Sequence, residues 1–154
     1  MTDWWQCVTI DAEMTLEIEP SLSERFPGLQ AIKAHVDDVR VDKSGLEFQE
    51  FKEGICQEAK RKYTLDSLKD VSIFRCYRDF FWKVGIDPTK IRPAAEALVR
   101  RILAGKPIPL INNVVDSYNL ASIKTEVALA AFNRDELKGN LLMRTAKRGE
   151  LFSE

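Results

Sequence analysis

The spacing of apolar residues predicts an α+β fold, in which a mixed sheet or partial barrel has helices packed against it. Near the N-terminus the apolar residues alternate with a period of two, as they do in strands. Between residues 45 and 124 they recur at the spacing of amphipathic helices, and strand-like segments return after that point. A chain of 154 residues can bury a core without disulfides, so we expect residues 1–154 to form a single domain.

The first part of the chain contains three strand patterns. QCVTID (residues 6–11) and TLEIE (residues 15–19) both alternate apolar and polar side chains. RFPGL (residues 25–29) contains a Pro-Gly pair and predicts a turn. QAIKAHVDDVRV (residues 30–41) alternates again, so we expect a third strand there.

Two amphipathic helix patterns follow. The first is GLEFQEFKEGICQEAKRKY (residues 45–63), and the second is DVSIFRCYRDFFWKVG (residues 70–85), where Gly85 stands at a position that ends a helix. We expect the apolar stripe of the second helix to lie in the core. That stripe consists of Ile73, Tyr77, Phe80 and Val84, with Phe74 and Phe81 beside it.

A third helix is predicted for RPAAEALVRRILAG (residues 92–105). Pro93 suits the first helical position, and Gly105 stops the helix. Glu96 precedes Arg100 by four residues, which is the favourable orientation for an ion pair on a helix surface.

The stretch INNVVDSYNLASIKTEVALAAFN (residues 111–133) combines apolar residues with an unusual set of amides. If residues 112–124 form a helix, Asn112, Asp116 and Asn119 share one face. These side chains either cap the helix and tie down neighbouring loops, or line a pocket for a polar ligand. From the residues alone we favour the first reading, in which Asn112 or Asn113 caps the helix and Asp116 and Asn119 tie down loops.

The last segments predict a return to strands. VALAAFN (residues 127–133) and NLLMRTA (residues 140–146) are expected to be strands, and NRDELKG (residues 133–139) a turn or a single helical turn.

The formal net charge of −1 argues against a generally basic nucleic-acid binder. The charge is nevertheless uneven, because residues 75–106 contain eight basic and only three acidic residues. This region is either a solvated helical surface or a surface that meets phosphates.

The three cysteines are far apart and odd in number, and the sequence has one histidine, His35. Zinc and a disulfide framework are therefore unfavourable interpretations, and we expect no metal and no cofactor. The sequence shows no signal peptide pattern and no apolar run of the length that spans a membrane, so we expect a cytoplasmic protein with no membrane partner. We place His35 on the surface, which leaves no Ser–His–Asp arrangement.

INNVVDSYN, followed by ALAAFNRDELKG and LLMRTAKRGE, resembles the tRNA-editing domain of the phenylalanyl-tRNA synthetase beta subunit, formed by the paired third and fourth domains of that subunit. YRDFFWKVGIDPTKIRPAAEALVRR is most similar to free-standing relatives of this domain. The resemblance extends over roughly residues 26–152. It implies an α+β fold and the hydrolysis of phenylalanine tRNA mischarged with tyrosine, in a pocket that positions the substrate without a covalent nucleophile.

The resemblance also assigns roles to single residues. Asn119 matches the pocket asparagine of the family, and Asp116 is its neighbour in the motif, so these two are the candidate catalytic residues. The expected partners are the acceptor end of tRNA and the amino acid moiety that it carries. The candidate substrate-binding residues are Asn112, Asn113 and Ala130, and the candidate tRNA-binding residues are Arg100, Arg101 and Lys106.

The chain departs from the family pattern at two places. Ala130 stands where the family has a histidine, so no imidazole is available there. The family domain continues into a glycine-rich loop with the acid that reads the tyrosine hydroxyl, whereas this sequence ends at Glu154. The resemblance therefore leaves two expectations open: the sequence is a fragment of such a domain, truncated at its C-terminal end, or the domain has lost that half. We therefore expect weak hydrolysis or none. The alternative function is a non-catalytic module that binds tRNA, an amino acid or a protein.

Overall fold

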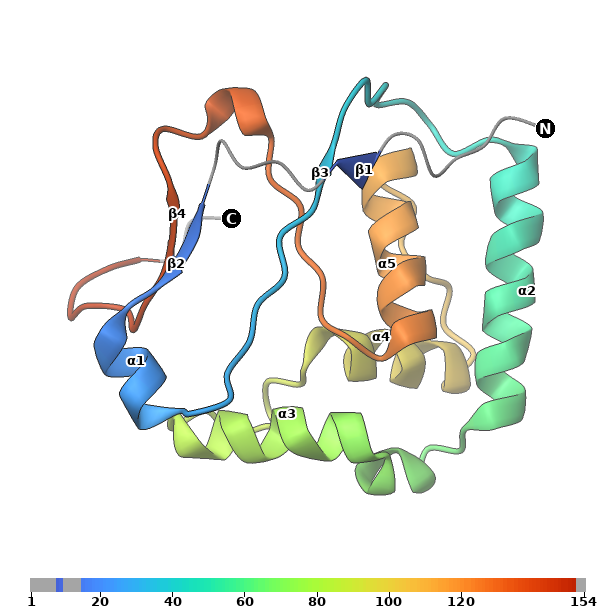
Figure 1. The fold of residues 1–154 in the computed structure, drawn as a ribbon. Helices are drawn as coiled ribbons and strands as arrows, with labels where there is room; N and C mark the ends of the chain where they lie inside the picture. Colours follow the sequence, from blue (N-terminus) through green and yellow to red (C-terminus); the bar gives the residue numbers. More distant parts are fainter. Residues whose placement is uncertain (1–7, 10–14, 152–154) are drawn as a thin grey trace. The chain divides into compact units, whose positions relative to one another are not determined.

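The computed structural model describes residues 8–9 and 15–151, and the chain divides into two compact units. The first unit takes the chain up to Arg40 and again from Phe132, and the second takes Val41–Ala131 (Figure 1). Strands lie in the first unit and the long helices in the second, which confirms the α+β class.

The described strands of the first unit form two small open sheets. β1 (Val8–Thr9) pairs antiparallel with β3 (His35–Val36), and β2 (Leu16–Ile18) pairs parallel with β4 (Leu141–Met143). These positions confirm the predicted strands at both ends of the chain, although β3 is much shorter than the alternating pattern of residues 30–41. The rest of the first predicted strand, at residues 6–11, lies outside the described residues.

Two short helices complete the first unit. α1 (Pro20–Arg25) begins at a proline, whose fixed φ suits the first helical turn, and it was not predicted from the sequence. The turn that follows has Gly28 at φ +103°, which confirms the predicted Pro-Gly turn. η3 (Arg134–Glu136) is the predicted single helical turn, and the Asn133 side chain caps it by accepting from the Asp135 N–H.

The second unit is a helical assembly, and its four main helices begin and end within two residues of the predicted bounds. Gly105, at φ +69°, follows the third of these helices, α4 (Ala94–Leu103), in the left-handed conformation that ends a helix. The elements are α2 (Leu46–Lys62), η2 (Ser67–Asp70), α3 (Ser72–Lys83), α4 (Ala94–Leu103) and α5 (Asn113–Thr125).

The hydrophobic core of the second unit lies where α2, α4 and α5 pack on one another. Phe74, which the prediction placed beside the apolar stripe of α3, is fully buried in this core, so the predicted core face of that helix is confirmed at this residue. Ile73, Tyr77 and Phe80 are half-buried, and Val84 is exposed. The other buried apolar residues of the cluster are Ile55, Ala59, Tyr63, Leu68, Ala95, Val99, Ile102, Ile108, Leu120 and Ile123.

The predicted strand over residues 127–133 is wrong, because this segment has no regular secondary structure. Side chains take the hydrogen bonds that a neighbouring strand would have taken. The Ser122 hydroxyl donates to the Val127 carbonyl at 2.6 Å, and the Ala128 N–H donates to the Tyr77 hydroxyl at 3.0 Å.

His35 lies half-buried on β3 rather than on the surface. Its Nε2 is 3.3 Å from an Asp37 carboxylate oxygen, and the guanidinium of Arg134 lies within hydrogen-bonding distance of the ring. Within the described part of the chain, no helix is long and apolar enough to cross a membrane.

Candidate functional site

The Asn112 side chain caps the first turn of α5. Its Oδ1 accepts from the N–H groups of Val114 and Val115 at 3.1 and 2.9 Å, two donors that have no partner within the helix. Asn112 itself has extended backbone angles, as an N-cap residue does. The capping role that we favoured for Asn112 is confirmed.

Asn113 joins α5 to the segment that precedes α2. Its N–H donates to the Asp42 carbonyl at 2.8 Å, and its Oδ1 accepts from the Asp42 N–H at 2.9 Å. The amide of Asn113 thus imitates a backbone pairing between two segments 71 positions apart.

Asp116 is only 3% exposed and is bound at both carboxylate oxygens. Oδ1 accepts from the Ile111 N–H at 3.0 Å, and Oδ2 accepts from the Ser44 hydroxyl at 2.6 Å. A buried carboxylate needs such donors, because desolvation without them costs several kcal/mol. Asp116 therefore fixes the connector that enters α5 and the loop that enters α2.

Asn119 lies one turn further along α5, and the expectation that its side chain ties down a loop is wrong. It is half-buried, and its side-chain amide forms no hydrogen bond with any residue in the described ranges. An amide offers two donors and one acceptor oxygen, so this group can bind a polar ligand without giving up a contact of the fold.

The segment that carries Ala130 leaves α5 through Glu126, which adopts left-handed backbone angles with φ +64°. Ala130 is exposed, and its methyl group offers no hydrogen bond. The side chains of Ser122 and Tyr77 hold the segment at Val127 and Ala128, as described above.

A cluster of charged and phenolic groups fixes Glu126, and the sequence patterns did not reveal it. The Glu126 carboxylate accepts from Lys62 Nζ at 2.6 Å and from the Tyr63 hydroxyl. Burial tends to raise the pKa of Glu126, but the hydrogen bonds from Lys62 and Tyr63 outweigh it and hold the pKa below its ordinary value. Burial and the contact with Glu126 raise the pKa of Tyr63. The periodicity of apolar residues predicts which side chains face the core. It does not predict a contact between the ends of two helices, such as the one between Lys62 and Glu126.

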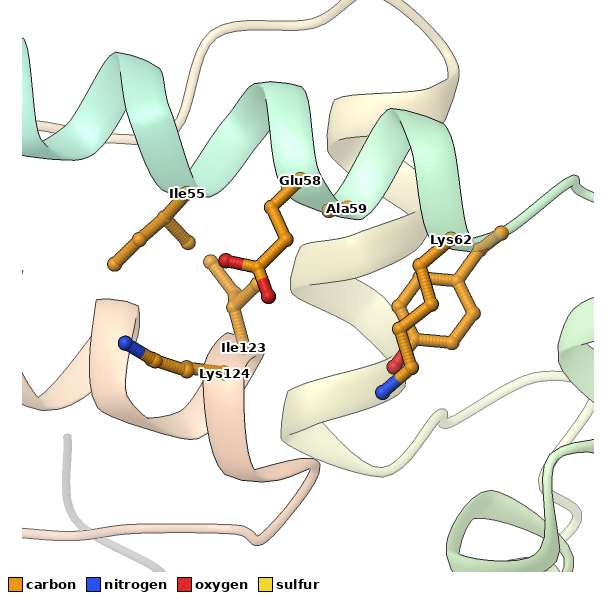
Figure 2. Close-up of a pocket in the computed structure, with 7 residues that line it drawn as sticks. Ile55, Glu58, Ala59, Lys62, Ile123 and Lys124 are labelled. Atoms are coloured by element: carbon orange, nitrogen blue, oxygen red, sulfur yellow. The ribbon is translucent and has the colours of Figure 1, made fainter.

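Next to this cluster, α2 and α5 enclose a small hollow (Figure 2). Its volume of about 20 Å³ is enough for about one water molecule. The residues that line the hollow are Ile55, Glu58, Ala59, Lys62, Tyr63, Ile123 and Lys124.

Arg100 takes part in an ion-pair cluster between α3 and α4. Glu96 is fully buried, and its carboxylate accepts two bonds from Arg78, Nε to Oε2 at 2.7 Å and Nη2 to Oε1 at 2.6 Å. Arg100 Nε donates to Oε1 at 3.0 Å, which confirms the predicted pair with Glu96 four residues before it. Burial tends to raise the pKa of Glu96, but the bonds from Arg78 and Arg100 lower it below its ordinary value, so the group remains ionised.

The two other candidate tRNA-binding residues lie where α4 ends. Arg101 is exposed and its Nε donates to the Pro107 carbonyl at 2.5 Å, so its side chain follows the connector toward α5. Lys106 is exposed in that connector. All eight candidate site residues belong to the second unit, but none of them lines the hollow of Figure 2.

In the part of the chain that the structure describes, no group of three or more histidine, cysteine, aspartate or glutamate side chains is placed to hold a metal ion. The arrangement around α5 is accordingly one of hydrogen-bonding amides and buried carboxylates.

No curated protein and no solved structure matches the chain. Residues 76–154, slightly more than half of the sequence, match the B3/4 domain, which is the domain family found in the phenylalanyl-tRNA synthetase beta subunit. The matched residues begin inside α3 and include α4, α5 and β4, and with them every candidate site residue. This chain belongs to the B3/4 domain family.

Proposed function

We propose that this protein is a free-standing homologue of the phenylalanyl-tRNA synthetase beta-subunit editing domain and binds the aminoacylated end of tRNA. The observation that carries the proposal is the amide of Asn119. It is half-buried, it has no hydrogen-bonding partner among the described residues, and it stands on α5 immediately after the polar residues that fix the start of that helix.

Each polar residue of the motif then has a distinct task. Asn119 binds the polar groups of the aminoacyl moiety, and the buried carboxylate of Asp116 keeps the start of α5 in place beneath it. Asn112 and Asn113 support the same helix end. Arg100, Arg101 and Lys106 supply the positive charge for the phosphates of the acceptor end.

Hydrolysis by this chain is expected to be slow. An aminoacyl ester is already activated, so orienting a water molecule and stabilising the oxyanion is sufficient for catalysis. Ala130 offers no donor to that oxyanion, and loss of one preorganised donor typically lowers the rate by about 10²–10³. The exposed methyl group of Ala130 is also the observation that favours the alternative, a non-catalytic module that binds aminoacylated tRNA without cleaving it.

The test is a combined binding and deacylation assay with a panel of correctly charged and mischarged tRNAs. We expect binding that depends on the aminoacyl group, and we expect Asn119→Ala to remove that dependence. Gln57→Ala is the matched control, because Gln57 is an exposed amide on α2 outside the motif, and this variant should behave like the wild type. Equal binding of charged and uncharged tRNA by the wild type would refute the proposal.

Restoring the imidazole separates catalysis from binding. If the family geometry is kept, Ala130→His should raise the deacylation rate while the affinity for tRNA changes little. Robust deacylation by the wild type that Asn119→Ala leaves intact would show that the site has been assigned to the wrong residues. Binding without any deacylation, in the wild type and in Ala130→His alike, would support the non-catalytic alternative.

A further inference from the structure

The cluster of Arg78, Glu96 and Arg100 contains more hydrogen-bonding capacity than the fold uses. The two guanidinium groups and one carboxylate leave a net charge of one positive unit. Three N–H groups point at Glu96: the Nε and one Nη2 hydrogen of Arg78, and the Nε of Arg100. Each guanidinium carries five N–H donors, so most of them remain.

The terminal nitrogens of Arg100 carry slightly more of the remaining donors than Arg78 does. Its Nε is bound to Glu96, but its two Nη nitrogens form no hydrogen bond with any residue in the described ranges. The Arg100 side chain is 30% exposed and that of Arg78 is 20% exposed, so solvent reaches both. The terminal fork of Arg100 is thus oriented by a buried carboxylate and open to a ligand.

Arg78 and Arg100 are also neighbours in space. One nitrogen from each guanidinium binds the same oxygen, Oε1 of Glu96, at 2.6 and 3.0 Å. Two guanidinium groups that share one oxygen atom lie close enough for their positive charges to repel each other. The negative charge of the fully buried Glu96 offsets that repulsion. A second anion placed against the outer side of the pair would offset it further. A phosphate group has the charge and the oxygen geometry that match an arginine fork.

We infer that Arg100 and Arg78, held by Glu96, form a binding site for one phosphate group, which is a phosphodiester of tRNA. This inference rests on the proposed function. Glu96 is then a positioning residue, since it touches the two arginines and not the ligand. Arg100 binds through its terminal fork, and Arg78 contributes charge and the Nη1 donors that Glu96 does not use.

The first experiment follows the arginine Nε–Hε signals by NMR during a titration with inorganic phosphate at constant ionic strength. We expect the signals of Arg78 and Arg100 to shift along a saturating curve. Arg75 is the internal control, because it lies on α3 as Arg78 does but is exposed and paired with Asp70 at 3.5 Å. Equal, non-saturating shifts of all arginines would mean general screening and would overturn the inference.

The second experiment measures tRNA affinity as a function of salt. Arg100→Lys keeps the charge but loses the fork and the Nε donor, and we expect its affinity to fall about tenfold, since hydrogen bonds to charged groups contribute about 1.5–3 kcal/mol. Arg75→Lys is the matched control and should leave affinity unchanged. Arg100→Gln should also reduce the slope of log affinity against log salt by about 0.7–0.9.

Glu96→Gln distinguishes a positioned site from a simple basic surface by the sign of its effect. The substitution adds one unit of positive charge, so general electrostatics would strengthen tRNA binding. A site that depends on Glu96 to hold both arginines should bind more weakly. If this variant does not fold, the Arg100→Lys and Arg75→Lys pair decides the question, because neither change alters the net charge.

The two proposals fail in different ways. Saturable phosphate binding at Arg78 and Arg100 in a protein that does not bind tRNA would refute the proposed function and leave the phosphate site in place. Aminoacyl-dependent tRNA binding with Arg100→Lys equal to its control would refute the phosphate site and leave the proposed function in place.

Discussion

At the scale of single residues, the motif at the start of α5 divides its polar side chains between the fold and the ligand. Asn112 and Asp116 each accept hydrogen bonds from backbone N–H groups at or just before the start of α5. The Asn119 side chain forms no such hydrogen bond with the described residues. Substitutions in the motif should therefore separate into those that change stability and those that change binding.

Asn112→Ala should lower the free energy of unfolding by about 0.5–2 kcal/mol, because it removes the acceptor of two N–H groups at the start of α5. Asn112→Asp keeps an acceptor oxygen and adds a negative charge at a helix N-terminus, so it should retain most of the stability. Urea denaturation of the three proteins measures the difference. Equal losses for alanine and aspartate would contradict the capping role.

Tyr63→Phe should lower the free energy of unfolding by about 1–3 kcal/mol, because the nearly buried carboxylate of Glu126 loses a donor. Tyr118→Phe is a matched control, since Tyr118 is half-buried on α5 and its hydroxyl has no hydrogen-bonding partner among the described residues. The control should change stability by less than about 0.5 kcal/mol. Thermal unfolding of both variants against the wild type would measure this, and a similar loss in both would refute the role given to Glu126.

At the scale of elements, the ion pairs at Glu96 connect α3 to α4. The pKa of Glu96 lies below its ordinary value in the folded protein. The unfolded chain therefore binds more protons in the acid range, so this carboxylate stabilises the fold above its ordinary pKa, about 4.3. That stabilisation is lost as the pH falls through the lower pKa of the folded state.

Glu96→Gln should be less stable than the wild type at neutral pH, by roughly 1–3 kcal/mol. The gap between the two proteins should narrow as the pH falls below about 4.3, because the wild type loses the charged form that the variant never had. Urea denaturation between pH 3 and 7 measures it. A gap that stays constant over this range would show that the charge of Glu96 does not stabilise the fold.

Sequence reasoning located the four long helices because each carries its own signal in the chain. The apolar spacing of α2 and the stop at Gly105 after α4 are local features of this kind. The Glu96–Arg100 pair was found for the same reason, since both residues lie on one helix. The bond from Arg78 to Glu96 was not predicted, because it joins two helices. The residue spacing within one helix does not show which residues of another helix it contacts.

The predicted strand at residues 127–133 shows a second limit. Alternating apolar residues favour an extended chain, but a strand also needs a neighbour for its backbone groups. Here the Tyr77 and Ser122 side chains occupy the groups of Ala128 and Val127. The assignment of roles to Asn119 and Ala130 came from the resemblance to the family, and it remains a prediction.

At the scale of the whole molecule, the buried apolar residues are unevenly distributed. Of those in the described part of the chain, Leu22 alone lies in the first unit, and the remainder lie in the second. The free energy of local opening is higher where more apolar side chains are buried. The helices of the second unit should therefore be the last part of the protein to open.

Native-state hydrogen exchange tests this distribution. We expect the slowest amides in α4 and α5, around Val99 and Leu120, and faster exchange in β2 and β4. Both strand pairs are short and lie in the unit with the smaller core, so they can separate without exposing much apolar surface. Equal protection of β2 and α4 would contradict the expectation and indicate that the chain opens as one cooperative unit.

The parallel pairing of β2 with β4 has a consequence for biosynthesis. The two strands are 125 positions apart, so at about 5–20 residues per second the ribosome completes β4 roughly 6–25 s after β2. During that interval all residues of α2 through α5 have been made, whereas β2 has no partner. An unpaired strand edge invites association with other nascent chains. β2 has only three residues and carries a carboxylate, Glu17, at its centre. A short strand with a charged residue is a poor template for pairing, so association is unfavourable until β4 has been synthesised.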